Sequence, residues 1–178
     1  MINKKNVPFY FAALVAFICL KAYHRMAGVD EFALFIFPVS KIIEFLTGAE
    51  ASYIIGEGYY FQSLDVLINK SCSGFNFCLI SFLLFTFLFV SHFEKPIKKV
   101  GALLSSILLS YVLTVVVNAS RIYALIVLQD MRVSFFIADQ DILHQCVGII
   151  TYLTFLVLTY LAIERFLNKR TNSHAKFT

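Results

Sequence analysis

The sequence predicts an all-α integral membrane protein: a polytopic bundle of transmembrane helices with a small β or irregular element at its outer face. Sixty per cent of the 178 residues are hydrophobic, 20 are phenylalanine and none is tryptophan, a composition outside the range of soluble globular domains. Four apolar runs approach the ~20 residues that a membrane-spanning helix needs: 8–23, 75–91, 100–117 and 147–163. No repeat or linker divides the chain, so residues 1–178 are expected to form a single membrane-embedded domain.

Two further apolar segments, 32–46 and 122–128, are shorter or more polar than these four runs. Each is expected to be interfacial, re-entrant or an additional span. For 32–46, the presence of Pro38, Lys41 and Glu44 favours the interfacial or re-entrant alternatives.

The basic residues give the expected orientation of the spans. The net charge is +4, and nine of the 15 Lys and Arg residues fall in three clusters: Lys4 and Lys5; Lys95, Lys98 and Lys99; Arg165, Lys169, Arg170 and Lys176. Because cytoplasmic flanks are enriched in Lys and Arg, the N-terminus, the loop near residue 95 and the C-terminal tail are expected to face the cytoplasm. Four spans then place the segments before 75, after 117 and before 147 at the outer face.

A small β element is expected before the second span. Residues 53–61 read as two short strands around the turn Gly56-Glu57-Gly58. Residues 64–69 alternate imperfectly between apolar and polar positions, as a half-buried strand does. This last strand leads directly to a cysteine, Cys72.

The run Ser71-Cys72-Ser73-Gly74 lies where this strand gives way to a membrane helix. Ser71 or Ser73 can cap the helix, and Gly74 permits a tight backbone. A cysteine at a helix N-terminus meets unsatisfied N–H groups and the positive end of the helix dipole, which favour the reactive thiolate. Those amides can also stabilise an oxyanion. Cys72 is therefore a candidate nucleophile, and a small buried structural residue is the alternative.

Arg121 and Asn118 are the polar residues that interrupt the apolar sequence between 100 and 128. A charge near membrane depth costs a few kcal/mol and usually faces the protein interior or water. The two residues are three apart, hence on one helical face, and a stripe leads toward them at steps of four: Ser106, Ser110 and Thr114. The alternative for Arg121 is a helix-end side chain that reaches the lipid headgroups.

His144 opens the last span and is the third candidate. Gly148 and Thr151 follow it on the same face, which permits close approach of another helix, such as the one that bears Arg121. An imidazole can donate or accept a proton near neutral pH; the alternative is an interfacial histidine without a catalytic role. No metal-ligand spacing, phosphate loop or nucleotide motif is present, so no metal, cofactor or nucleic acid is expected.

These motifs resemble those of the exosortase/archaeosortase family of membrane cysteine transpeptidases, and the short length resembles most the compact exosortase K type. The resemblance covers about residues 59–160. It rests on Ser71-Cys72-Ser73-Gly74 at the start of a membrane helix, Asn118-Ala-Ser-Arg121 at the outer end of a later one, and His144 at the start of the last.

The resemblance implies a function and a role for each candidate. Cys72 would be the nucleophile, Arg121 the transition-state stabiliser and His144 the proton donor or acceptor. The substrates would be exported proteins that end in a short motif, a transmembrane helix and a basic cluster. The chain would cleave this sorting signal through a thioester and transfer the protein to an acceptor. It would lie in the bacterial cytoplasmic (inner) membrane, in contact with the lipid bilayer, with its site at the periplasmic face.

Two alternative functions remain open at the level of sequence. A thiol-redox membrane protein would use Cys72 together with the nearby Cys78. A non-catalytic assembly subunit would use Arg121 and Asn118 to bind a partner helix.

Overall fold

The computed structural model of the chain describes residues 4–130 and 140–174. In this part of the chain, short 3₁₀ turns accompany five α-helices and three β-strands. The elements are α1 (Val7–Met26), α2 (Ala33–Thr47), β1 (Ser52–Ile54), β2 (Gly58–Phe61), β3 (Val66–Ile68), α3 (Phe75–His92), α4 (Pro96–Asp130) and α5 (Gln140–His174).

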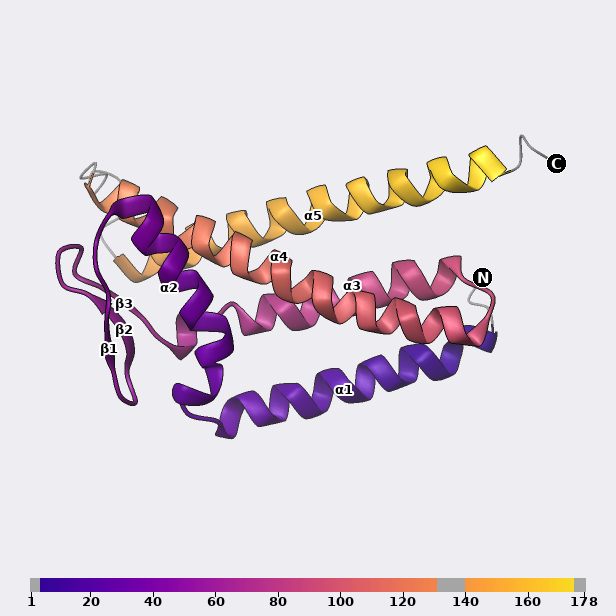
Figure 1. Ribbon diagram of the computed structural model, residues 1–178, viewed down its shortest axis with the longest axis horizontal. Helices are drawn as coiled ribbons and strands as arrows, with labels where there is room; N and C mark the ends of the chain where they lie inside the picture. The colour runs from indigo at the N-terminus through magenta and orange to yellow at the C-terminus, as the bar shows by residue number, and fades with distance from the viewer. Residues whose placement is uncertain (1–3, 131–139, 175–178) are drawn as a thin grey trace.

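Four of these helices, α1, α3, α4 and α5, are long and apolar enough to cross a membrane. Without water, a backbone must satisfy its own polar groups, and long apolar runs do so as helices. The predicted helical bundle is therefore confirmed as an architecture. Figure 1 shows α3 and α4 running side by side at its centre, with α1 on one side and α5 on the other.

The two ends of the bundle differ in what they carry. The N-terminus, the α3–α4 connection and the end of α5 lie at one end, and α2 and the sheet lie at the other (Figure 1). At the first end, the buried Lys99 at the start of α4 donates to Asn6 Oδ1 at 2.6 Å, which joins it to the start of α1. The basic clusters, as far as residues 4–130 and 140–174 contain them, thus share one end of the bundle, as the expected topology requires.

The segment 122–128, predicted as a separate element, is instead the continuation of α4. This helix runs unbroken from Pro96 to Asp130, well beyond the predicted end at 117. The prediction was wrong because Asn118 and Arg121 were read as the polar end of a span. Both side chains find partners inside the bundle, so the helix continues through them.

The segment 32–46 forms α2, which lies across the end of the bundle (Figure 1). Its 15 residues extend about 22 Å, short of the roughly 30 Å hydrocarbon core. Pro38 inside the helix cannot donate to the carbonyl of Leu34. The Tyr111 hydroxyl on α4 donates to this oxygen instead, at 2.9 Å.

The three strands form the antiparallel sheet β1–β2–β3, so the predicted β element before Cys72 is confirmed. Phe61 on β2 and Ile68 on β3 are fully buried, in a cluster with α2 and α4. Gly58 has a positive φ of 121°, and a Cβ there would lie 2.3 Å from the Ile68 carbonyl oxygen. This position therefore requires glycine.

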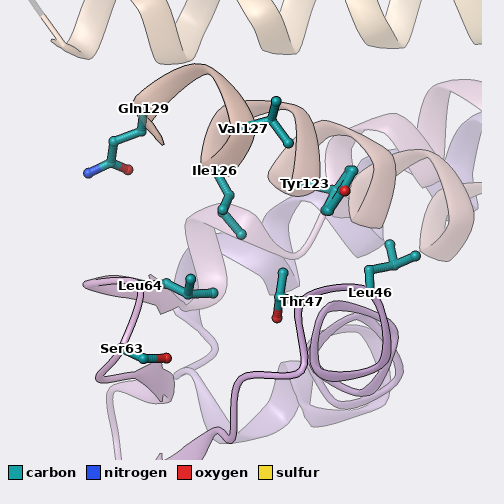
Figure 2. Close-up of a pocket in the computed structure, with 8 residues that line it drawn as sticks. All are labelled: Leu46, Thr47, Ser63, Leu64, Tyr123, Ile126, Val127 and Gln129. Atoms are coloured by element: carbon teal, nitrogen blue, oxygen red, sulfur yellow. The ribbon is translucent and has the colours of Figure 1, made fainter. Parts of the chain in front are cut away.

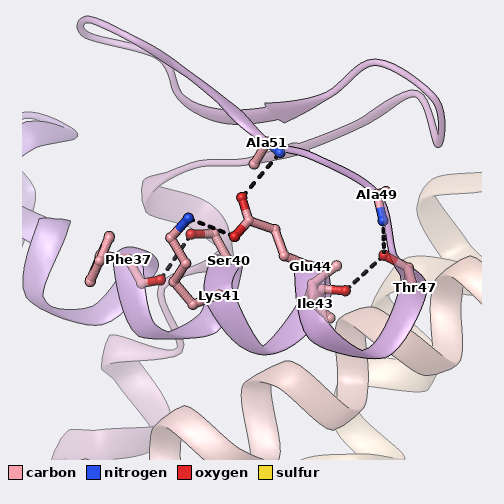
Figure 3. Close-up of polar contacts among 8 residues, drawn as sticks. All are labelled: Phe37, Ser40, Lys41, Ile43, Glu44, Thr47, Ala49 and Ala51. Carbon is pink, nitrogen blue, oxygen red and sulfur yellow. Dashed lines mark hydrogen bonds and ion pairs between the residues drawn. The ribbon is translucent and has the colours of Figure 1, made fainter.

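Polar contacts fix the sheet to the end of α2 (Figure 3). Glu44 accepts a hydrogen bond from the Ala51 N–H at 3.1 Å and pairs with Lys41 at 2.6 Å. The hydrogen bond from Lys41 lowers the pKa of Glu44 below its ordinary value. Thr47 accepts from the Ala49 N–H at 3.3 Å. The chain thus enters β1 in a defined direction.

The expected topology can be tested by labelling single cysteines placed at the two ends. Glu57 in the β1–β2 turn and Glu94 in the α3–α4 connection are both exposed, so Glu57→Cys and Glu94→Cys are matched changes in a cysteine-free chain. In spheroplasts, a membrane-impermeant maleimide should label Glu57→Cys at once and Glu94→Cys only after lysis. The reverse pattern, or labelling of both before lysis, would contradict the topology.

Candidate active site

Cys72 ends a short 3₁₀ turn, Lys70–Cys72, that connects β3 to α3. Asn69 caps this turn: its Oδ1 accepts from the Ser71 N–H at 3.0 Å and from the Ser71 hydroxyl at 2.7 Å. The Cys72 N–H donates to the Asn69 carbonyl at 3.0 Å. The turn directs Cys72 inward, where it is 8% exposed and joins the apolar cluster of α2, the sheet and α4.

The chain passes from Cys72 into α3 through Ser73 and Gly74. Gly74 adopts the left-handed conformation, with φ of 68°, as its sequence position predicted. The Ser73 hydroxyl accepts from the Phe75 N–H at 3.3 Å. The N-cap of α3 is Gly74, which has no side chain to cap the helix, so the prediction that Ser71 or Ser73 occupies this position was wrong. Ser73 lies one residue earlier, and Ser71 belongs to the preceding turn.

Gly74 also allows the start of α3 to approach α4 closely. A Cβ at this position would lie 3.0 Å from Thr114 Cγ2 and 3.2 Å from Asn118 Cγ. Such distances are shorter than ordinary van der Waals contacts. The absence of a side chain at Gly74 thus places Cys72 next to the buried polar face of α4.

Asn118 joins α4 to the Cys72 backbone. It is fully buried, and its Nδ2 donates a hydrogen bond to the Cys72 carbonyl oxygen. Its Oδ1 accepts from the Tyr152 hydroxyl on α5 at 2.9 Å. One amide on α4 thereby connects the turn before α3 to α5.

Arg121 lies on the same face of α4 as Asn118, as its spacing predicted. It is 6% exposed, and its Nη1 donates to the Tyr152 hydroxyl at 3.0 Å. The guanidinium carbon lies 5.5 Å from the centroid of the Tyr152 ring, within range of a cation–π interaction. A Cβ at Gly148 would lie 3.2 Å from Arg121 Nε, so the arginine packs across α5. Its side chain is thus directed into the bundle, as the first of the two readings of this residue expects.

The predicted polar stripe of Ser106, Ser110 and Thr114 is fully buried, as expected. These hydroxyls bond carbonyls of their own helix, at 2.8, 2.9 and 2.6 Å respectively. Their hydrogen bonds are therefore satisfied locally, and their small size permits α3 to pack against α4. The stripe supports the bundle and contributes no reactive group.

His144 lies on α5, one helical turn before Gly148. Because Gly148 contacts Arg121, the backbone of His144 belongs to the same end of the bundle. Its side chain is outside the described residues, so its role as proton donor or acceptor remains a prediction.

Tyr152 is the site residue that the sequence reasoning missed. It lies on α5 one turn beyond Gly148 and two turns beyond His144, so its helical spacing was the available signal. Its ring stacks on Phe77 of α3, with centroids 4.8 Å apart and planes at 17°.

A cavity of about 550 Å³ lies beside the site, between the end of α2, the β2–β3 turn and the last turns of α4 (Figure 2). Its lining is uncharged: Leu46, Thr47, Ser63, Leu64, Tyr123, Ile126, Val127 and Gln129. Leu64 and Ile126 also pack against the apolar cluster that contains Cys72. The cavity can accept an apolar group of moderate size.

The chain matches no protein-family model, no curated protein and no solved structure. Within residues 4–130 and the described part of α5, no three His, Cys, Asp or Glu side chains are grouped to hold a metal ion. The residues around Cys72 are therefore the basis for inferring the function.

The role of Gly74 can be tested against Gly48, which ends α2. Both have φ near 70°, but a Cβ at Gly48 would meet nothing within 4 Å. Gly48→Ala should cost about 1 kcal/mol from backbone strain alone. Gly74→Ala should cost a further ~1–3 kcal/mol because the methyl group overpacks against α4. Unfolding followed in detergent should show this difference; equal losses would mean that Gly74 does not set the α3–α4 contact.

Proposed function

We propose that the chain is a membrane cysteine transpeptidase that cleaves the C-terminal sorting signal of exported proteins and transfers them to an acceptor. The observation that carries this proposal is the buried connection between Cys72 and Arg121, through Asn118 and Tyr152. Through these contacts, the backbone of a cysteine and a permanent cation from a separate element are linked at one end of an apolar bundle, where a charge is expensive to keep.

In the first step, the Cys72 thiolate attacks the scissile carbonyl carbon, and a carbon–sulfur bond forms while the carbonyl oxygen becomes an oxyanion. The Arg121 guanidinium is the positive charge available to stabilise that oxygen, and the free N–H groups at the start of α3 add to it. The apolar cluster around Cys72 excludes water and strengthens these interactions.

In the second step, the tetrahedral intermediate collapses and the carbon–nitrogen bond breaks. The leaving amine takes a proton from His144, and the hydrophobic tail departs. The acyl group remains on Cys72 as a thioester. An acceptor amine or hydroxyl, or water, then attacks the thioester and regenerates the Cys72 thiol.

The layout of the bundle fits the proposed substrate. With the basic clusters in the cytoplasm, Cys72 would lie at the periplasmic face of the inner membrane. An exported protein anchored by a transmembrane helix with basic residues inside would present its motif on that same side. The topology of substrate and enzyme would therefore match.

The surroundings of the other residues disfavour the two alternatives. The Cys78 sulfur lies 3.8 Å from the Ser110 hydroxyl, in a buried contact with α4, and Cys72 and Cys78 are both free thiols. A redox pair would need the two sulfurs to meet, whereas the Cys78 sulfur contacts Ser110 on α4. Asn118 and Arg121 are already bonded within their own chain, whereas an assembly subunit would direct them to a partner helix.

The proposal predicts that processing depends on Cys72 and not on Cys78. An exported protein carrying a motif, a helix and a basic C-terminus should lose its tail in cells with the wild-type chain. Cys72→Ala should abolish this loss, because no thioester can form. The matched change Cys78→Ala should reduce this processing only slightly. Immunoblotting of the tagged protein measures the result, and normal processing with Cys72→Ala would refute the mechanism.

A further inference from the structure

The Tyr152 hydroxyl is the point at which three helices meet around the site. It accepts a hydrogen bond from Arg121 Nη1 at 3.0 Å and donates one to Asn118 Oδ1 at 2.9 Å. Asn118 uses its other end to bind the Cys72 carbonyl oxygen. One oxygen atom therefore connects the cation to the segment that carries the nucleophile.

The ring that carries this hydroxyl contacts side chains from both α3 and α4. Phe77 of α3 stacks on the ring at 4.8 Å, and the Arg121 guanidinium lies 5.5 Å from its centroid. A phenol has one proton to donate and lone pairs to accept with. Donation to Asn118 leaves the oxygen free to accept from Arg121, so both bonds can form at once.

We infer that Tyr152 is a positioning residue of the site, whose hydroxyl sets the Arg121 guanidinium and, through Asn118, the Cys72 backbone. In this way α5 fixes the placement of the cation relative to the thiol. The expected effect on kcat rests on the proposed function. The expected effect on how readily the Cys72 turn opens does not.

Loss of the hydroxyl should act on Asn118 first. The amide oxygen would lose its donor, and the side chain could rotate to exchange its oxygen and nitrogen. The Cys72 carbonyl would then lose its own donor, and the turn at Lys70–Cys72 would open more often. Arg121 would lose one of the groups that orient its guanidinium.

Tyr152→Phe tests the inference because it removes the hydroxyl and keeps the ring on Phe77. The matched control is Tyr160→Phe, two turns further along α5, where the tyrosine is also partly buried.

The first readout needs no substrate. The purified chain reacts with N-ethylmaleimide, and mass spectrometry measures the rate at which each cysteine is labelled. Tyr152→Phe should speed labelling of Cys72 about five-fold, the equivalent of one hydrogen bond. Labelling of the buried Cys78 should not change.

The second readout is processing of the tagged substrate. Tyr152→Phe should lower kcat about 10- to 100-fold, as loss of a hydrogen bond to a charged group does, with KM within about two-fold. Tyr160→Phe should match wild type in both readouts.

The two readouts separate the inference from the proposed function. Faster Cys72 labelling in a chain whose processing does not need Cys72 would support positioning by Tyr152 and refute the proposed chemistry. Unchanged Cys72 labelling in Tyr152→Phe would overturn the inference. An unchanged kcat in a Cys72-dependent enzyme would also overturn it, as would equal acceleration at Cys72 and Cys78.

Discussion

The rest of the site depends on one constraint: the buried side-chain amide of Asn118 needs a hydrogen-bond acceptor for its N–H and a donor for its oxygen. Asn118 is fully buried on α4, and an unpaired amide in an apolar environment costs several kcal/mol. Its Nδ2 donates to the Cys72 carbonyl oxygen, and its Oδ1 accepts from the Tyr152 hydroxyl. Satisfying this residue therefore requires the turn before α3 to meet α4 and α5 at one level of the bundle. The glycines make the meeting possible, because Gly74 and Gly148 leave no side chain where Asn118 and Arg121 pack.

The other elements at this end of the bundle hold the Cys72 segment in place against α4. The sheet and α2 pack over the start of α3 and bury Cys72 against α4. The Asn69 cap and the Ser73 hydroxyl fix the backbone on either side of the cysteine. Arg121 joins through Tyr152, so its charge lies among aromatic and polar groups inside the bundle. The result is a thiol and a cation held by separate helices, with the backbone between them constrained at several points.

The sequence was sufficient for part of this arrangement. Span lengths, the turn at Gly56–Gly58 and the shared face of Asn118 and Arg121 follow from hydrophobicity, glycine placement and helical spacing. The unbroken course of α4 did not follow, because two polar residues in an apolar run look like a helix end until their partners are known. Tyr152 was missed for a related reason: a tyrosine in an apolar helix is common, and only the fold brings its hydroxyl to Asn118. Neither Ser71 nor Ser73 is the N-cap of α3, because the 3₁₀ turn Lys70–Cys72 shifts the helix start so that Gly74 takes this position, and no local pattern revealed that turn.

The most direct test of the central claim is a search for the covalent intermediate. The purified chain would be mixed with an exported protein that carries the motif, helix and basic C-terminus, without an acceptor amine. Acid quenching and peptide mass spectrometry would then locate any adduct. The account predicts the truncated substrate attached to Cys72 through a bond that neutral hydroxylamine cleaves. Release of the tail with no adduct at Cys72, or with an adduct elsewhere in the chain, would contradict it.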